Sequence, residues 1–372
     1  LFVSKVSYGP RMPFTPLAFP MTQNTLPVLN CKSFVEWPKW DYRRLSGLGN
    51  VQLYDIVVFN FPAGDTVCIK RDNPDYYSIL LENGVDYVNR NPAVAKGVDF
   101  SNSWKVNHFL MDLGRKQVLN PANPLSDIAV RPVDVRDCYV KRCVGLPGDS
   151  IEIRHNDLYI NGIKQKQPEG VQFTYQVKTN GVLLNDKFFE TYGISNADRA
   201  SAGIGPVYTL PLTDEKASQI AQLPIIVSMQ KIDDSYSSFD RFTIFPHSED
   251  YKWSRDNFGP LWIPKKGATV SIDSVNIMLY QRIIEAYEHH TLEMKSNGTI
   301  FIDGKESSTY TFEMDYYWMM GDNRHMSADS RYWGFVPEDH VVGKPIVVWL
   351  SLDPDKGLFS DIRWERFFKM VE

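Results

Sequence analysis

The sequence has few of the residues and motifs that mark several large classes of protein. It has four cysteines in 372 residues, with no CxxC pair and no Cys/His zinc spacing, which excludes a disulfide scaffold and a zinc finger. Lys and Arg number 40 against 45 Asp and Glu, so no basic field points to nucleic acid. No apolar run reaches the roughly 20 residues that span a bilayer. HExxH, GxSxG and phosphate-binding glycine motifs are absent, and we expect neither a metal nor a cofactor.

Aromatic residues, by contrast, are abundant at 13% of the chain. They favour strands and suit a boundary between apolar and wet surroundings, which indicates β structure and a membrane-facing or peptide-binding surface. The length predicts two or three domains. The chain starts at Leu1, inside a pattern typical of a strand, so we expect a fragment whose beginning has been removed.

Hydrophobic patterning predicts a mainly β protein with helical insertions rather than an alternating βαβ fold. We expect strands at 51–61, 137–144, 310–320 and 345–350, the last of them buried, and hairpins at 151–163, turning at Asn161-Gly162, and at 292–304. Short helices are expected at 75–82, stopped by Gly84, and at 104–113, stopped by Gly114. An amphipathic helix should follow Ser274, with Ile277, Tyr280, Ile284 and Tyr287 on one face.

Residues 1–45 combine closely spaced prolines with Phe, Trp, Leu and Met. Prolines at this density exclude a helix or a central strand, so the segment should be an extended apolar loop. Two interpretations stay open: a loop folded onto the core, or an interfacial patch.

Lys141 is a candidate for chemistry because it lies in the middle of a predicted strand. The period of two places Tyr139, Lys141 and Cys143 on one face, with Val140 and Arg142 on the other. If the Lys141 face is buried, desolvation lowers the pKa of the ammonium and makes the lysine a possible general base. The alternative is an exposed Lys-Arg pair on a strand edge.

The segment 321–334 (GDNRHMSADSRYWG) packs polar residues between an apolar strand and Trp333. Several of these side chains must therefore be partly buried and paired. Asp329 and Arg331 suit a charge-assisted pair, and Ser327 could hydrogen-bond a lysine. A turn with a structural salt bridge explains each residue singly but not all of them together.

These segments resemble two signatures of type I signal peptidases, the membrane-anchored Ser/Lys proteases that remove signal peptides: YVKRCVGLPGD (139–149) and GDNRHMSADSRYWG (321–334). YDIVVF (54–59) resembles the strand before the family's catalytic lysine, and FVSKVSYG (2–9) resembles the stretch after its serine motif. The long insertions and the Pro-rich start resemble the Bacteroidetes branch. The resemblance implies a signal-peptidase-type fold of coiled antiparallel sheets with a second β-rich domain.

Residue by residue, the resemblance implies roles for the matched positions. Lys141 corresponds to the general base, and Ser327 to the serine that orients it. The ion pair and turn that support the site correspond to Asp329, Arg331, Asp322, Asn323 and Arg324; the substrate cleft corresponds to Tyr139 and Val140. Met326 departs from the asparagine common in the family.

The family's nucleophilic serine should lie upstream of Leu1. Ser4 cannot replace it, because Ser4 and Lys5 are neighbours that point to opposite faces of a strand. We therefore expect that residues 1–372 alone do not cleave a substrate. The oxyanion hole, which the family builds partly from the serine's own N–H, would be missing as well.

The resemblance also implies a cellular setting and a domain plan. Substrates would be exported preproteins with Ala-x-Ala-like cleavage sites. The protein itself would be held at the inner membrane by an N-terminal anchor missing from this chain, with its catalytic domain on the periplasmic side and in contact with the lipid surface. We expect a catalytic core of 1–150 with 305–355, containing a helical insert near 72–130. A non-catalytic β-rich module at 151–304, with a helix near 274–288, and a tail at 356–372 would complete the chain.

Two rival functions remain. A self-cleaving SOS-type repressor shares Ser/Lys chemistry but needs a DNA-reading domain and lacks the 321–331 pattern. A non-catalytic paralogue that binds preproteins or partners fits every visible residue, and it predicts that the natural upstream sequence lacks the serine.

Overall fold

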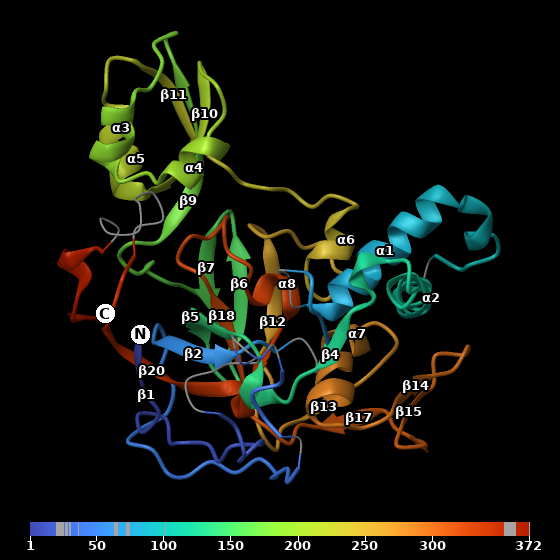
Figure 1. Cartoon of the computed structure of the whole chain (residues 1–372). Helices are drawn as coiled ribbons and strands as arrows, with labels where there is room; N and C mark the ends of the chain where they lie inside the picture. The colour runs from blue at the N-terminus through green and yellow to red at the C-terminus, as the bar shows by residue number, and fades with distance from the viewer. Residues whose placement is uncertain are drawn as a thin grey trace.

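The computed structural model describes residues 1–19, 26, 29, 31–35, 37–62, 66–71, 75–100, 102–352 and 362–371. Antiparallel sheets form the body, and the longer helices lie at its periphery (Figure 1). The predicted mainly β fold of antiparallel sheets with helical insertions is confirmed. Parts of the predicted Pro-rich loop, helical insert and tail, at 20–25, 72–74 and 353–361, lie outside the described residues.

The largest sheet has the strand order β1-β20-β2-β5-β18-β19, and β21 pairs with β20. Its strands are β1 (Phe2–Ser4), β2 (Ile56–Asn60), β5 (Cys138–Gly145), β18 (Tyr316–Met320), β19 (Val336–Pro337), β20 (Val341–Val348) and β21 (Lys369–Met370). On one face Val57, Cys143 and Met319 are fully buried in a shared apolar cluster. On the other face Val144 and Trp318 join a larger core with the second sheet. The strand β5 therefore lies between two cores.

The second sheet has the order β12-β6-β7-β8. Its strands are β6 (Ser150–Arg154), β7 (Asp157–Ile160), β8 (Ile163–Lys164) and β12 (Phe258–Trp262). Smaller antiparallel units are formed by β13 (Thr269–Ser271) with β17 (Thr309–Thr311), by β14 (Leu292–Met294), β15 (Ile300–Ile302) and β16 (Lys305–Glu306), and by β3 (Thr66–Cys68) with β4 (Ile128–Val130). The predicted hairpins are present. However, the β6–β7 turn is His155-Asn156, at positive φ, and Asn161-Gly162 instead joins β7 to β8.

A small module, residues 171–231, projects from the body at the top left of Figure 1. It contains β9 (Gln172–Thr179), β10 (Val207–Thr213), β11 (Ile226–Lys231), α3 (Asp186–Tyr192), α4 (Asn196–Ser201) and α5 (Asp214–Ala221). Val177, Leu210 and Ile220 are completely buried in a core of its own. Residues 151–304, which we predicted as one module, thus contribute to two hydrophobic clusters, and the domain plan stays a prediction.

The helical hairpin corrects two sequence predictions. Helix α1 (Tyr76–Arg90) continues through Gly84, and α2 (Ser103–Val118) continues through Gly114. A Cβ at Gly84 would lie 2.0 Å from the carbonyl oxygen of Leu110, and one at Gly114 would lie 1.9 Å from that of Leu80. These glycines allow the two helices to cross closely; they do not end them.

Other predicted elements are partly right. Helix α7 (Ile277–Arg282) continues into a π-helical turn (Ile283–Tyr287), and the expected face of Ile277, Tyr280, Ile284 and Tyr287 is buried as predicted. The predicted strand 51–61 shrinks to β2 because residues 53–54 turn, and 310–320 splits into β17 and β18. The predicted buried strand 345–350 is wrong at its end: Trp349 and Leu350 lie beyond β20 and are 48% and 44% exposed. The remaining short elements are α6 (Asp240–Thr243), α8 (Ser330–Trp333) and 3-10 turns at Pro92–Ala95, Pro124–Ser126, Val133–Val135, Glu338–His340 and Trp364–Arg366.

Candidate active site

Lys141 lies on β5, between β2 and β18, and pairs with Val57 of β2. Its strand neighbours on the same face, Tyr139 and Cys143, pack into the apolar cluster of the main sheet. Lys141 itself is half-buried, and the Arg142 side chain is only 11% exposed. The alternative of an exposed Lys-Arg pair is therefore wrong.

The Lys141 ammonium donates a hydrogen bond from Nζ to Ser327 Oγ at 2.7 Å. Burial lowers the pKa of Lys141 below its ordinary value of 10.5. The carboxylate of Asp329 acts in the opposite direction, and the guanidinium of Arg331 lowers it further. A lysine that loses its proton more readily, with its nitrogen held by a hydroxyl, is suited to proton transfer.

Gly321, the residue after β18, leaves the room for this contact. A Cβ at this position would lie 2.1 Å from Ser327 Oγ, 2.6 Å from Ser327 Cβ and 3.3 Å from Lys141 Nζ. No side chain fits there without moving Ser327. The glycine of the sequence motif therefore acts through close approach rather than through a special turn.

Asp329 and Arg331 form a fully buried ion pair behind the Ser327 loop, with side chains 0% and 1% exposed. Asp329 accepts hydrogen bonds from Arg331 Nε at 2.9 Å and Nη2 at 2.8 Å, and from the Gly321 N–H at 3.1 Å. Burial alone would raise the pKa of Asp329. Arg331 and these donors outweigh burial and hold the pKa below its usual value. The pair thus connects the start of the loop to its end.

The three predicted turn residues, Asp322, Asn323 and Arg324, form their hydrogen bonds with groups other than Lys141. Asp322 accepts two hydrogen bonds, both 2.9 Å, from Arg142, whose side chain lies on the opposite face of β5. Asn323 forms a parallel bridge with Gln172, and Arg324 donates to Gln167 at 3.0 Å. These contacts join the loop to Arg142, Gln172 and Gln167, while the charge of Asp322 raises the pKa of Lys141.

Tyr139 and Val140 lie where one edge of β5 is unoccupied. β2 pairs with β5 over 138–142, whereas β18 reaches only from 142 to 145. Within the described part of the chain, no strand pairs with the second edge at 138–141. Antiparallel ladders alternate, so the backbone groups of Val140 face this open edge while those of Lys141 face β2. Val140 is 39% exposed.

The sequence predicts no specific contact for several residues around the site. Trp333 packs edge-on against Tyr139, with ring centroids 5.5 Å apart, and against Phe61 at 5.0 Å. His325 is buried, and its Nε2 lies 2.8 Å from a carboxylate oxygen of Asp256. His325 stood inside the 321–334 segment and could have been singled out as a polar residue that needs a partner. Nothing local marks Asp256, which is distant in sequence.

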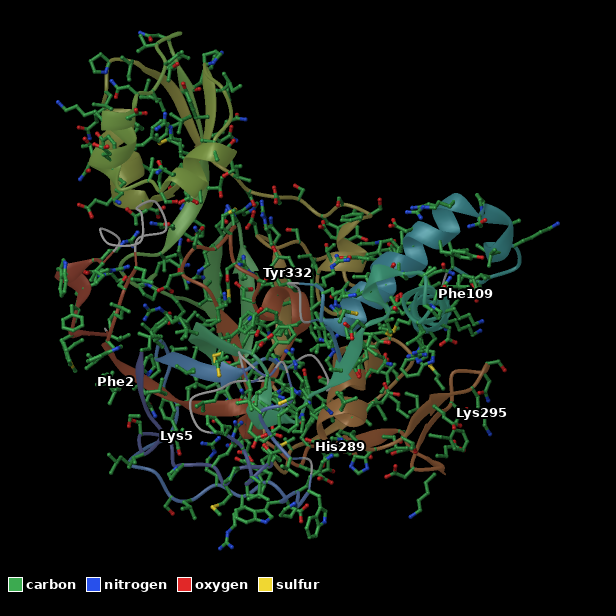
Figure 2. The ribbon with its side chains drawn as sticks, viewed as in Figure 1. Phe2, Lys5, Phe109, His289, Lys295 and Tyr332 are labelled. Atoms are coloured by element: carbon green, nitrogen blue, oxygen red, sulfur yellow. The ribbon has the colours of Figure 1, made fainter. Side chains whose placement is uncertain are left out.

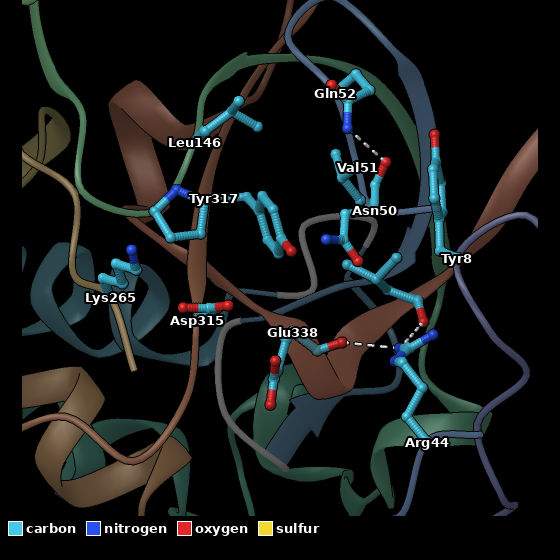
Figure 3. A pocket seen from close by; sticks show the side chains of 12 residues that line it. Tyr8, Arg44, Asn50, Val51, Gln52, Leu146, Lys265, Asp315, Tyr317 and Glu338 are labelled. Atoms are coloured by element: carbon cyan, nitrogen blue, oxygen red, sulfur yellow. Dashed lines mark hydrogen bonds between the residues drawn. The ribbon is translucent and has the colours of Figure 1, made fainter. Parts of the chain in front are cut away.

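A separate cavity of about 380 Å³ lies near the other end of β5, where Leu146 and Pro147 follow the strand (Figure 3). Its lining is largely polar and includes Tyr8, Arg44 and Glu338. Arg44 is held there by backbone oxygens of Glu338 and Val341 at 2.9 and 2.6 Å. Lys141 and Ser327 do not line this cavity.

Two further features concern the described residues only. No group of three or more His, Cys, Asp and Glu side chains among them is arranged to hold a metal ion. None of their helices combines the length and the apolar character needed to span a bilayer.

Comparisons with known proteins give one family match over most of the chain. A family model described as signal peptidase, peptidase S26, matches residues 2–201 and 263–350. Signal peptidase I of Haemophilus influenzae is 38% identical over 71 residues, which are 19% of this chain and 20% of that protein. Signal peptidase I of Buchnera aphidicola subsp. Acyrthosiphon pisum is 38% identical over 90 residues, 23% of this chain and 29% of that protein. The matches thus span less than a third of the length of either relative.

A short stretch is more similar still: signal peptidase I of Aquifex aeolicus is 56% identical over 36 residues, 10% of this chain and 14% of that protein. Among solved structures, a signal peptidase I from Enterococcus faecalis matches 56% of this chain and 83% of its own, with 17% identity and a TM-score of 0.18. At that score the structural superposition supports no conclusion.

Proposed function

This chain belongs to the signal peptidase family, peptidase S26, and from that premise we propose that it removes N-terminal signal peptides from exported preproteins by Ser/Lys acyl transfer. The observation that supports the proposal most is the half-buried Lys141 ammonium, 2.7 Å from Ser327 Oγ. Gly321, a residue of the matched motif, lies against this pair, and the buried Asp329–Arg331 ion pair is bonded to the Gly321 N–H.

In the proposed mechanism, Lys141 in its neutral form takes the proton of a serine hydroxyl as that hydroxyl attacks the scissile carbonyl. Desolvation favours the neutral amine, which is the form that acts as a base. Ser327 holds the amine in one orientation. Lys141 then protonates the leaving amine, and afterwards it activates the water that hydrolyses the acyl-enzyme.

We place the nucleophilic serine, and with it one oxyanion donor, in natural sequence preceding Leu1. Ser4 of β1 does not serve: β1 is separated from β5 by β20 and β2, and Ser4 Oγ is bonded to the Ser7 hydroxyl at 2.8 Å. On this proposal residues 1–372 alone are inactive, and the upstream residues restore activity.

The substrate is proposed to bind as an added strand at the open edge of β5. The backbone groups of Val140 would pair with it, and alternate side chains would enter pockets beside Tyr139 and Val140. The family resemblance suggests small residues, Ala-x-Ala-like, before the cut. A strand at this edge would continue in line with β18 and end near Gly321, beside the lysine.

A lipid surface is the second proposed partner. Polar contacts hold the N-terminal loop: the Arg11 side chain donates to the Asp339 carbonyl at 2.6 Å, and the N–H of the buried Thr15 donates to Asp134 at 2.8 Å. The same loop leaves Trp37 80% exposed and Phe19 58% exposed. A loop fixed by its polar residues with its aromatic side chains outward suits the interfacial interpretation.

A second aromatic group lies beside the chain ends. Phe2, at the left rim of the molecule in Figure 2, contacts Trp349 edge-on at 5.6 Å. The ring of Trp349 also packs against those of Phe367 and Phe368, with ring centroids 5.6 and 5.3 Å apart. All four aromatic side chains of this group remain substantially exposed. We propose that the protein acts at the outer face of the bacterial inner membrane, held by an anchor outside this chain.

The decisive experiment extends the chain with the natural residues upstream of Leu1 and measures cleavage of an Ala-x-Ala signal-peptide substrate. Lys141→Met should abolish cleavage. Lys344→Met should not, because Lys344 lies on β20 and pairs with Asp55, the residue before β2, away from the Ser327 loop. No cleavage by the folded, extended chain would contradict the proposal.

That negative outcome would favour the alternative, a non-catalytic protein that binds preproteins on the same fold. The open edge of β5 supports peptide binding with or without chemistry. A natural upstream sequence that lacks the serine, together with binding of the signal peptide, would establish this alternative.

A further inference from the structure

His325 is a buried residue, 6% exposed, in the loop that carries Ser327. Its Nδ1 accepts a hydrogen bond from the backbone N–H of Thr174 at 2.9 Å. A backbone N–H can only donate, so Nδ1 carries no proton and the ring proton is on Nε2. Nε2 then donates to Asp256 Oδ1 at 2.8 Å, and both side chains are 1% exposed. The two contacts fix one neutral tautomer.

The hydrogen bond from Thr174 to His325 lies at the end of a short backbone pairing between the small module and the Ser327 loop. The Gln172 N–H donates to the Asp322 carbonyl at 2.8 Å, and the Arg324 N–H donates to the Gln172 carbonyl at 2.9 Å. The start of β9 therefore runs parallel to 322–325, and the Thr174 bond to His325 extends this pairing by one side chain.

The second contact holds the loop from the other side. Asp256 lies just before β12, and its other carboxylate oxygen accepts from the Asp234 N–H at 2.9 Å. The neighbouring carbonyl of Arg255 accepts from Arg331 Nη1 at 3.2 Å. The same short segment thus supports both His325 and the arginine of the buried ion pair.

We propose that His325 is a positioning residue: clamped between Thr174 of the small module and Asp256, it sets the position of the Ser327 loop and so the contact between Ser327 and Lys141. This inference rests on the proposed function, because it assigns to the small module a role in the geometry of that same site. If the clamp opens, Ser327 withdraws and water reaches the Lys141 ammonium. The charged groups that then still act on Lys141 are Asp329, Arg331 and Asp322.

The test measures the titration of Lys141 in residues 1–372, which needs no nucleophile. Lysine side chains labelled with ¹³C at Cε report protonation by NMR, and Lys141→Met identifies the signal. His325→Ala should raise the Lys141 midpoint by roughly one pH unit, a tenfold change in proton affinity. In the extended chain, the same variant should lower kcat about tenfold at pH 8 with KM nearly unchanged.

Two conservative variants separate the contacts. His325→Asn keeps an acceptor near the position of Nδ1, and His325→Gln keeps a donor near the position of Nε2, so each should shift Lys141 less than His325→Ala does. If His325→Ala does not fold, the Lys141 midpoints of His325→Asn and His325→Gln test the inference instead. His155→Ala is the matched control: His155 also pairs with an aspartate, Asp233, at 2.5 Å, but its side chain is 78% exposed. It should leave the Lys141 midpoint unchanged.

A folded His325 variant that loses thermal stability while Lys141 titrates as before would overturn the inference and leave His325 a purely structural residue. A wild-type Lys141 that titrates with the other lysines would overturn it as well. If the extended chain cleaves nothing but His325→Ala still shifts Lys141, the inference holds and the proposed function fails.

Discussion

Removing the charge of Asp329 should destabilise the fold far more than removing that of Asp322, although both residues form paired hydrogen bonds with an arginine. Asp329 is 0% exposed, and its partner Arg331 is 1% exposed. Asp329→Asn leaves the guanidinium buried without a counter-charge, which typically costs about 3–5 kcal/mol. The Asp322 side chain is 38% exposed, so water screens its pair with Arg142. Asp322→Asn should cost about 1 kcal/mol or less.

The pH dependence follows from the lowered pKa of Asp329. A carboxylate with a lower pKa in the folded state than in the unfolded state stabilises the fold at pH values above the unfolded pKa of about 3.9. That contribution disappears as the pH falls through the folded-state pKa. The difference in unfolding free energy between the wild type and Asp329→Asn should therefore be complete at pH 6–7 and shrink below about pH 4.

Urea denaturation followed by tryptophan fluorescence measures both quantities, with the wild type and both variants at pH 7 and at a series of lower values. Equal losses for Asp329→Asn and Asp322→Asn at pH 7 would refute the reasoning from burial. If the difference in unfolding free energy between the wild type and Asp329→Asn stayed constant down to pH 3, Asp329 would not be the charged group responsible.

Three further predictions concern packing and the surface. Gly321→Ala places a methyl group 2.1 Å from Ser327 Oγ, so it should separate Ser327 from Lys141 and raise the Lys141 midpoint in the ¹³C titration. Gly84→Ala should destabilise the helical hairpin by about 1–3 kcal/mol in thermal unfolding, because its Cβ would lie 2.0 Å from the Leu110 carbonyl oxygen. Trp37→Ser should weaken binding to phospholipid vesicles severalfold in a sedimentation assay, because this side chain is 80% exposed on the proposed membrane surface.

Each of these variants has a control within the chain. Gly49→Ala serves both glycine variants, because a Cβ at Gly49 would meet no atom within 4 Å, and it should be neutral in both assays. Ile204→Ser controls the lipid assay, since Ile204 is 94% exposed but lies on the small module. Vesicle binding reduced equally by both serine variants would contradict a specific lipid-facing loop. A Gly84→Ala protein as stable as wild type would show that the helices separate easily.

The structure also explains why some predictions from sequence failed. An isolated glycine weakens a helix, so the sequence predicts helix ends at Gly84 and Gly114. In the fold they lie at the crossing of two helices, where only glycine avoids a backbone carbonyl of the partner. Glycine is unfavourable within a single helix, but here the close approach of the second helix requires it. No local sequence pattern reveals that approach.

The sequence by itself determined which face of its strand Lys141 shares with Tyr139 and Cys143, because alternation along a strand is a property of the backbone. It also indicated that Asp329 and Arg331 pair, since their spacing is local. Only the tertiary structure decided that Ser327 lies 2.7 Å from a lysine 186 positions away, that Asp256 faces His325, and that one edge of β5 is open at 138–141. These contacts join segments that are distant along the chain, and they arise from how two cores pack around β5 rather than from any local propensity.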